Sequence, residues 1–311
     1  MANEPLLLVG AAGFVGRHLT RALLDSGKRV IAITRRGQAP IDPRAKQLSA
    51  EALGDDLHAW TEQVASVGAV MHLASGSNPG SSAGAPRAEL TQNLLPLFTL
   101  LEALQSHAHI PLHYMSSAGS LYGAKQSGSS AESDLVDPRS YHGAGKVAAE
   151  HFIRAWCAQF GGTATIIRPS NVYGPGQEPR PGFGVIPNAF ARMLRGLSMD
   201  VWGDGSQTRD YIFVSDVVDL CVAALRRPAR SGALTVNAAS GSSTSLNDLF
   251  TLLEGTSGLP LKRTYFPQRA VDADRVAIDI QVAAKELEWM PRMSLKTGLE
   301  ETWRWIRSTE G

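Results

Sequence analysis

The N-terminal segment carries the clearest pattern of apolar and polar positions in the chain. Residues 6–9 are an unbroken apolar run, which predicts a short buried strand. A second apolar run at 30–33 predicts another strand, and between the two runs apolar residues recur at helical spacing, at Val15, Leu19, Ala22 and Leu23. The order strand, turn, helix, strand indicates an α/β fold.

Three glycines fill the turn between the first strand and the helix. Gly10, Gly13 and Gly16 have the spacing that lets a turn pass close to a pyrophosphate and lets the helix pack close to its strand. The free N–H groups at the helix N-terminus then face the anion. Glycines also serve ordinary turns, but the strands on both sides favour a dinucleotide-binding site.

Apolar periodicity continues the alternation of strands and helices. Residues 68–75 predict the next buried strand, and the Gly-, Ser- and Pro-rich segment 76–86 leaves its carboxyl end. That position favours an active-site loop over a simple linker. Long amphipathic helices are expected at 87–106, where Pro96 should introduce a kink, and at 141–160. Their broad apolar faces belong either to the core or to a contact with a second subunit.

Composition narrows the class of protein. The chain has 311 residues, enough for one large α/β unit or two lobes, and its 30 basic and 29 acidic residues leave a net charge of +1. Such a balance predicts no general affinity for nucleic acid or anionic membranes. Cys157 and Cys221 lie in apolar helical patterns, which argues against disulfides and cysteine-based metal sites. No apolar run approaches the ~20 residues of a membrane span, so a cytoplasmic protein is expected. No metal site is expected either.

The end of the second strand bears on the choice of cofactor. Dinucleotide folds often place an acidic residue there to hold the adenosine ribose, but this chain has Thr34, Arg35 and Arg36. Two guanidinium groups suit a 2′-phosphate, so they favour NADP over NAD, with a solvated basic turn as the alternative. Farther along, Asp55 and Asp56 follow a predicted strand, and Asp56 is the candidate acceptor for the adenine amino group.

The glycine turn is the first of a series of ordered motifs that reaches the C-terminal region. The later ones are "HLAS", "MSSAGSLYG", "GAGKVAAE", "IIRPSNVYGPGQ", "GVIPNAFARMLRG", "VWGDGSQTRDYIFVSDVVDLCVAAL" and "ELEWMPRMSLKTGLEETW". In this order they resemble the extended short-chain dehydrogenase/reductases of the NAD(P)-dependent nucleotide-sugar epimerase/dehydratase family, especially its UDP-glucose 4-epimerase-like branch. The resemblance covers nearly the whole chain.

The order of elements and this resemblance together imply an architecture. Residues 1–168 alternate strands and helices, which predicts a doubly wound parallel α/β sheet of the Rossmann type. Residues 169–311 are expected to form a smaller mixed α/β substrate lobe that interleaves with the first domain near 200–245. A nucleotide-sugar substrate should lie in the cleft between them. The resemblance also implies a homodimer formed through the long helices.

Catalysis in the resembled family uses a Tyr and a Lys four residues later, which share one helix face, and a Ser or Thr from the preceding strand. Here the Lys corresponds to Lys146, but the residue four positions earlier is His142. Tyr141 stands one position early, and a shift of one residue turns a side chain by about 100° around a helix. The hydroxyl position falls on Ala118, with Ser117 as its neighbour.

His142 has two interpretations. The imidazole could transfer the proton itself, because its ordinary pKa of about 6.5 lies closer to neutrality than that of a phenol, and Lys146 would keep it neutral. Alternatively, His142 only caps or packs the start of the helix, and the site is altered or inactive. A helix start that departs from regular geometry would restore Tyr141 as the acid/base.

The resemblance also implies ligand contacts elsewhere. Lys146 would hold the cofactor ribose, and further cofactor contacts would come from Phe14, Leu57 and Leu73. On the substrate side, Ser117 would meet the sugar. The nucleotide diphosphate and ribose would be bound by Asn171, Arg209, Arg269 and Asp272.

Three functions follow from these expectations. The first is 4-epimerisation of a nucleotide sugar through a transient 4-keto sugar and bound NAD(P). The second is an NADP-dependent reduction of a 4-keto nucleotide sugar, favoured if Arg35 and Arg36 bind a 2′-phosphate. The third is a protein that binds cofactor and nucleotide sugar without turnover, because the family Tyr is missing.

Overall fold

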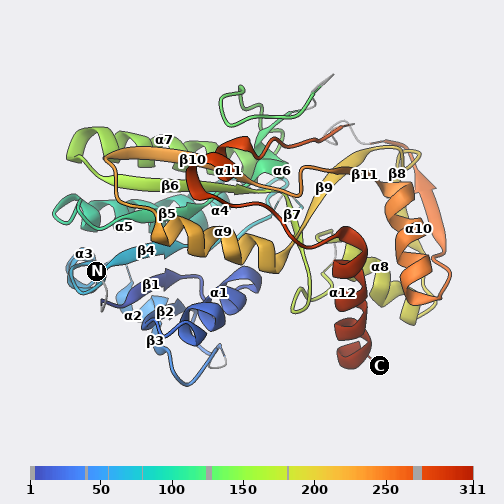
Figure 1. Ribbon diagram of the computed structural model, residues 1–311, viewed down its shortest axis with the longest axis horizontal. Coiled ribbons are helices and arrows are strands. Elements are labelled where there is room, and N and C mark those ends of the chain that lie inside the picture. Colours follow the sequence, from blue (N-terminus) through green and yellow to red (C-terminus); the bar gives the residue numbers. More distant parts are fainter. Residues whose placement is uncertain are drawn as a thin grey trace.

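Figure 1 shows the computed structural model of the chain, with the large sheet at one end and the smaller lobe at the other. The structure describes residues 4–38, 41–54, 56–78, 80–123, 128–180, 182–268 and 275–310.

In this described part of the chain, seven parallel strands form the large sheet, in the order β10-β6-β5-β4-β1-β2-β3. The strands are β1 (Leu6–Val9), β2 (Val30–Thr34), β3 (Lys46–Ser49), β4 (Ala69–His72), β5 (Leu112–Met115), β6 (Thr163–Pro169) and β10 (Gly232–Ala238). The first six follow the dinucleotide-binding order, which reverses at β1 and opens a crevice at the carboxyl ends of the strands. The predicted doubly wound parallel sheet is therefore confirmed.

Helices cover both faces of the sheet. One face packs against α3 (Leu57–Ala65), α5 (Leu95–Gln105) and α7 (Tyr141–Phe160), and the other against α1 (Phe14–Asp25), α9 (Val214–Arg226) and α11 (Gln281–Leu287). Buried strand residues alternate between the two cores, with Leu7 in the first and Leu8 in the second. Short helices α2 (Ala50–Leu53) and α6 (Ala118–Leu121) follow β3 and β5.

The predicted helix at 87–106 is interrupted next to Pro96. It consists of α4 (Pro86–Glu89), a π-helical turn η1 (Leu90–Leu94) and α5. Pro96 has no N–H to continue the regular ladder, so the helix widens just before it and the regular α-helix restarts with Pro96 in its first turn. The widened turn separates Glu89 from α5 and lies against α7.

The smaller lobe begins where β6 ends. It contains two small sheets, β7 (Asn171–Tyr173), β9 (Thr208–Phe213) and β11 (Ser243–Ser245) in one, and β8 (Met199–Trp202) and β12 (Arg263–Phe266) in the other. Around a third core lie α8 (Val185–Leu194), α10 (Leu246–Ser257) and α12 (Leu295–Glu310). Between β9 and β11 the chain returns to the large sheet through α9 and β10. Of the helices in the described ranges, none is both long and apolar enough to traverse a bilayer.

Candidate active site

The glycine turn after β1 forms a close-fitting cradle. Gly10 has φ of +87°, and a Cβ there would lie 2.6 Å from the Ala74 backbone nitrogen. A Cβ on Gly16 would lie 2.4 Å from the Gly10 carbonyl oxygen, so α1 can approach the turn only without a side chain. Gly13 is the N-cap of α1 and supplies no side-chain cap, which leaves the helix N–H groups for a ligand. These residues fit a dinucleotide pyrophosphate.

Other predicted cofactor residues lie at the same sheet edge. Phe14 begins α1, and Leu73 follows β4 with its N–H donating to the Val9 carbonyl at 2.8 Å. Leu57 begins α3 and is 43% exposed. Asp56 is the N-cap of α3, where its Oδ1 accepts from two helix N–H groups. The structure therefore gives Asp56 a capping role, with Oδ2 still able to accept from a ligand.

The basic turn after β2 is contacted by a carboxylate from a later element, which the local sequence could not show. Arg35 and Arg36 are both exposed. Glu51, from α2, accepts a hydrogen bond from the Arg36 N–H at 2.7 Å and another from the Ser49 hydroxyl at 2.7 Å. These bonds hold the pKa of Glu51 below its ordinary value. The region expected to meet the adenosine ribose therefore has both an acid and two arginines.

The start of α7 separates the two candidate acid/base residues. Ser140 caps the helix by accepting from the Gly143 N–H at 3.1 Å, so the helix begins regularly at Tyr141. Tyr141 is 47% exposed, whereas His142 is 7% exposed and Lys146 is 4% exposed. His142 and Lys146 thus share the buried face, and Tyr141 does not lie with them.

Burial changes the ionisation of both residues. Lys146 Nζ donates to the Met115 carbonyl at 2.8 Å and to the Tyr114 hydroxyl at 3.3 Å. Burial lowers the pKa of Lys146 to about 8. Burial, and then the positive charge of Lys146, lower the pKa of His142 to about 4. The imidazole is therefore neutral at pH 7 and can accept a proton.

Three side chains around His142 were not predicted as site residues from the sequence. His142 Nδ1 lies 3.0 Å from Ser77 Oγ, in the loop after β4. Ser77 donates to Glu89 Oε2 at 2.5 Å, and Asn93 Nδ2 donates to Glu89 Oε1 at 2.8 Å. The sequence pattern that could have pointed to them is the four-residue spacing of Glu89 and Asn93, on the helix that follows the predicted active-site loop.

A buried polar network supports the carboxyl end of β5. Arg168 on β6 pairs with Glu150 on α7 through bonds of 2.6 and 2.9 Å, and both side chains are 5% exposed. The Ser116 hydroxyl donates to Glu150 at 2.6 Å and is buried, so it is bound to the protein rather than presented to a substrate. Ser117, the next residue, is the N-cap of α6 and donates to the Ser120 hydroxyl at 3.1 Å.

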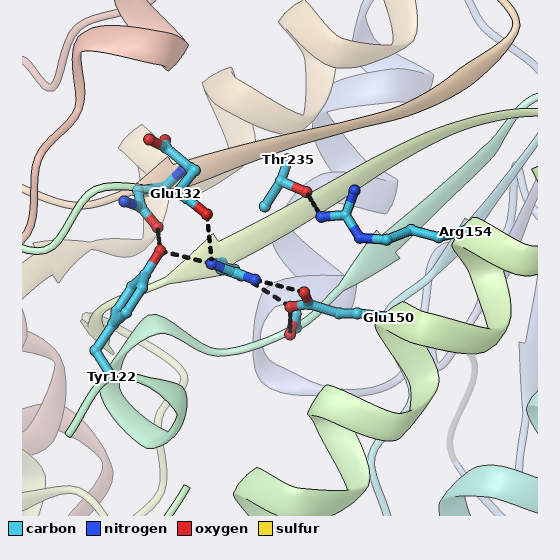
Figure 2. A network of polar contacts seen from close by, with 8 residues as sticks. Tyr122, Glu132, Glu150, Arg154 and Thr235 are labelled. Atoms are coloured by element: carbon cyan, nitrogen blue, oxygen red, sulfur yellow. Dashed lines mark hydrogen bonds and ion pairs between the residues drawn. The ribbon is translucent and has the colours of Figure 1, made fainter. Parts of the chain in front are cut away.

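The network continues across β6 to β10. Figure 2 shows Tyr122 and Glu150 on opposite sides of the guanidinium they share. Tyr122 accepts from Arg168 at 2.7 Å and donates to Asn237 Oδ1 at 2.9 Å. Glu132 then accepts from the Asn237 N–H at 2.7 Å. These bonds connect β10 to the wall of the site.

The predicted substrate residues are partly brought together. Asn171 on β7 pairs in register with Tyr211 on β9, two residues from Arg209. Asn171 Nδ2 donates to the Asp210 carbonyl at 2.8 Å, and its Oδ1 lies beside Gly119 of α6. Arg209 Nη1 donates to the Thr208 carbonyl at 2.8 Å. Arg269 and Asp272 lie outside the described residues.

A pair of partly exposed aromatic side chains in the smaller lobe was also not predicted from the sequence. Trp202 and Phe266 stack with ring centroids 4.9 Å apart, and each is 37% exposed. They stand on the paired strands β8 and β12, just before the turn that leads to β9. An exposed aromatic surface of this kind can stack a nucleotide base.

Known proteins are similar to this chain in sequence and in fold. The chain is 31% identical to UDP-glucose 4-epimerase of Mycolicibacterium smegmatis, over 97% of this chain and 98% of that protein. It is 30% identical to dTDP-4-dehydro-6-deoxy-D-allose reductase of Streptomyces bikiniensis, over 98% and 97% of the two chains. The crystal structure of Thermotoga maritima UDP-glucose 4-epimerase with UDP-glucose superposes with a TM-score of 0.89 at 28% identity, covering 98% of this chain and 99% of that one.

The family assignment rests on the fold, the glycine cradle and a sequence match. Residues 6–239 match the model of the NAD dependent epimerase/dehydratase family, which contains the cradle and the buried face of α7. The match also confirms the prediction of a nicotinamide cofactor. The chain belongs to the NAD dependent epimerase/dehydratase family.

Proposed function

We propose that this protein is a nucleotide-sugar 4-epimerase that works through a transient 4-keto sugar, with His142 as the proton carrier. The observation that carries the proposal is the position of His142. It is neutral, buried and one helical turn before Lys146, on the face where the family places its Tyr. The relatives that are 4-epimerases of nucleotide sugars support the same reaction.

Each site residue has a role in this reaction. A bound nicotinamide would supply the redox chemistry, taking a hydride from the sugar C4 and giving it back to the opposite face of the 4-keto sugar, which inverts C4. His142 takes the proton of the C4 hydroxyl and later gives it back. Lys146 donates two of its three ammonium protons to hydrogen bonds within the protein, and the third can be donated to the cofactor ribose. Ser117 supplies a hydroxyl to the sugar, and Asn171 and Arg209 bind the diphosphate.

The proposal is tested by replacing His142. His142→Ala should lower turnover of UDP-glucose or another accepted nucleotide sugar by about 10²–10⁴ and leave cofactor affinity unchanged. In the unmodified protein, kcat/KM should fall above about pH 8, where Lys146 loses its proton, and should stay level on the acid side for as long as the protein remains folded, because His142 becomes charged only near pH 4. If His142→Ala is harmless while Tyr141→Phe abolishes turnover, Tyr141 is the acid/base instead.

A second function is favoured by the basic turn. Arg35 and Arg36 are exposed after β2 and suit the 2′-phosphate of NADP, and one relative is a reductase of a 4-keto deoxysugar nucleotide. We propose NADP-dependent reduction as the alternative. Cofactor use separates the two, because an epimerase recycles its cofactor whereas a reductase consumes NADPH in proportion to product. Binding of nucleotide sugars without any turnover would instead support a binding protein.

We also propose a homodimer formed through α5 and α7. Phe98 and Phe152 from these helices pack together with ring centroids 4.3 Å apart and ring planes tilted by 48°, and Phe152 is 50% exposed. Leu95 and Phe160, on the same two helices, are also apolar and exposed, at 46% and 41%. Sedimentation equilibrium measures the assembly directly, and a monomer at all concentrations would contradict it.

A further inference from the structure

The amide of Asn93 is fixed on both sides. Its Oδ1 accepts a hydrogen bond from the Gly76 N–H at 2.7 Å. A backbone N–H can only donate, so the amide atom that faces Gly76 must be the oxygen. Nδ2 therefore points the other way, where it donates to Glu89 Oε1 at 2.8 Å and to Ser77 Oγ at 2.9 Å.

This orientation determines how the Ser77 hydroxyl uses its one proton. Ser77 Oγ lies 2.5 Å from Glu89 Oε2, 2.9 Å from Asn93 Nδ2 and 3.0 Å from His142 Nδ1. A carboxylate can only accept, so the hydroxyl proton goes to Glu89. The other two contacts must use the Ser77 lone pairs. His142 Nδ1 therefore carries a proton and donates it to Ser77.

The carboxylate at the centre of these bonds is enclosed. Glu89 is 4% exposed and lies against α7, where a Cβ on Gly145 would be 2.5 Å from its Oε1. Only glycine at this position leaves room for the carboxylate. The negative charge of Glu89 also opposes the effect of burial on the pKa of Lys146. Glu89 is therefore enclosed, its charge acts on Lys146, and it is connected to His142 through the Ser77 hydroxyl.

We infer that Ser77, Glu89 and Asn93 are positioning residues that hold His142 in the Nδ1–H tautomer, so that Nε2 exchanges the proton with the substrate. The inference rests on the proposed function for its chemistry. In the forward step the sugar O–H bond breaks and an Nε2–H bond forms, while the C4 hydride passes to the oxidised nicotinamide. The imidazolium keeps its Nδ1 proton and donates it to Ser77 Oγ. Glu89, which accepts the Ser77 hydroxyl proton, stabilises the positive charge. In the return step the hydride adds to the opposite face of the 4-keto sugar, while the Nε2–H bond breaks and its proton goes to the C4 oxygen.

The tautomer can be measured in the cofactor-free protein. Nitrogen chemical shifts from long-range ¹H–¹⁵N correlation spectra distinguish Nδ1–H from Nε2–H, and the His142 signals are assigned by their loss in His142→Asn. The unmodified protein should show the Nδ1–H form at pH 7. Ser77→Ala should shift the ring toward Nε2–H, because the group that accepts from Nδ1 is gone. Glu102→Gln, which changes an exposed carboxylate on α5, is the control and should change nothing.

Kinetics provide a second measurement. Ser77→Ala and Glu89→Gln should lower kcat about 10-fold to 100-fold with KM within about twofold, and Ser77→Thr, which keeps the hydroxyl, should restore most of the loss. The inference would be overturned if His142 carried its proton on Nε2 in the unmodified protein, or if Ser77→Ala left the tautomer unchanged. Either result would count even if the enzyme epimerises sugars. Conversely, a tautomer that shifts in a protein with no turnover of nucleotide sugars would support the positioning and reject the proposed function.

Discussion

Three buried histidines should make the protein unstable in mild acid. His72 and His113 are each 4% exposed and His142 is 7% exposed. Burial is the main cause that lowers the pKa of His72 to about 3 and of the other two to about 4, from 6.5, with smaller contributions from Lys146 and, at His113, from Arg227. Nδ1 of His72 and of His113 has no hydrogen-bond partner in the described structure, so a proton on that atom would be buried without an acceptor.

The sign and size follow from proton linkage. Between pH 6.5 and pH 4 the unfolded chain binds protons at these rings and the folded chain does not, so stability falls as the pH falls. From about pH 7 to about pH 5.5, each ring with an unfolded pKa near 6.5 contributes about 1.2 kcal/mol to this loss. The three together remove about 4 kcal/mol, a large part of the roughly 5–15 kcal/mol that stabilises a typical domain.

Urea denaturation followed by tryptophan fluorescence at the two pH values measures this loss as a change in midpoint at constant m. His113→Gln should remove about one third of the pH dependence, because a neutral amide replaces one of the three rings. His58→Gln is the matched control, since the His58 side chain is 82% exposed. Equal free energies of unfolding at both pH values would refute the reasoning.

Three other changes test separate parts of the structure. Replacing Arg35 and Arg36 with Ala should weaken NADP binding from severalfold to about a hundredfold and hardly affect NAD, and tighter binding of NAD than NADP by the unmodified protein in calorimetry would contradict this. Arg209→Ala should raise the nucleotide-sugar Kd about tenfold, and a loss of cofactor affinity instead would show that the two ligands are not bound separately. Glu150→Ala should cost about 3–5 kcal/mol in denaturant unfolding because it leaves a buried guanidinium unpaired, whereas Glu254→Ala should cost less, because the side chains of its pair with Arg263 are 23% and 34% exposed; equal losses would show that burial is not the cause.

The sequence by itself determined the parts of this protein that depend on local periodicity and spacing. The strand, glycine turn and helix at residues 6–25 follow from apolar runs and from Gly10 and Gly16, and the structure has them at the same places. The helix at 141–160 is also as predicted, and its regular start sets which of Tyr141 and His142 is buried. Local geometry is sufficient here because each of these features involves residues only a few positions apart.

Only the tertiary structure decided what surrounds the candidate acid/base. Ser77 lies 65 residues before His142, and it reaches the ring because β4 and the start of α7 meet at one edge of the sheet. Glu51 reaches the Arg36 N–H because β3 pairs with β2, and no local sequence pattern predicts this pairing of strands. Spacing along the chain predicts which residues share a helix face, but the charges and hydrogen bonds at a site depend on which strand ends lie together, and these are fixed by packing of the whole sheet.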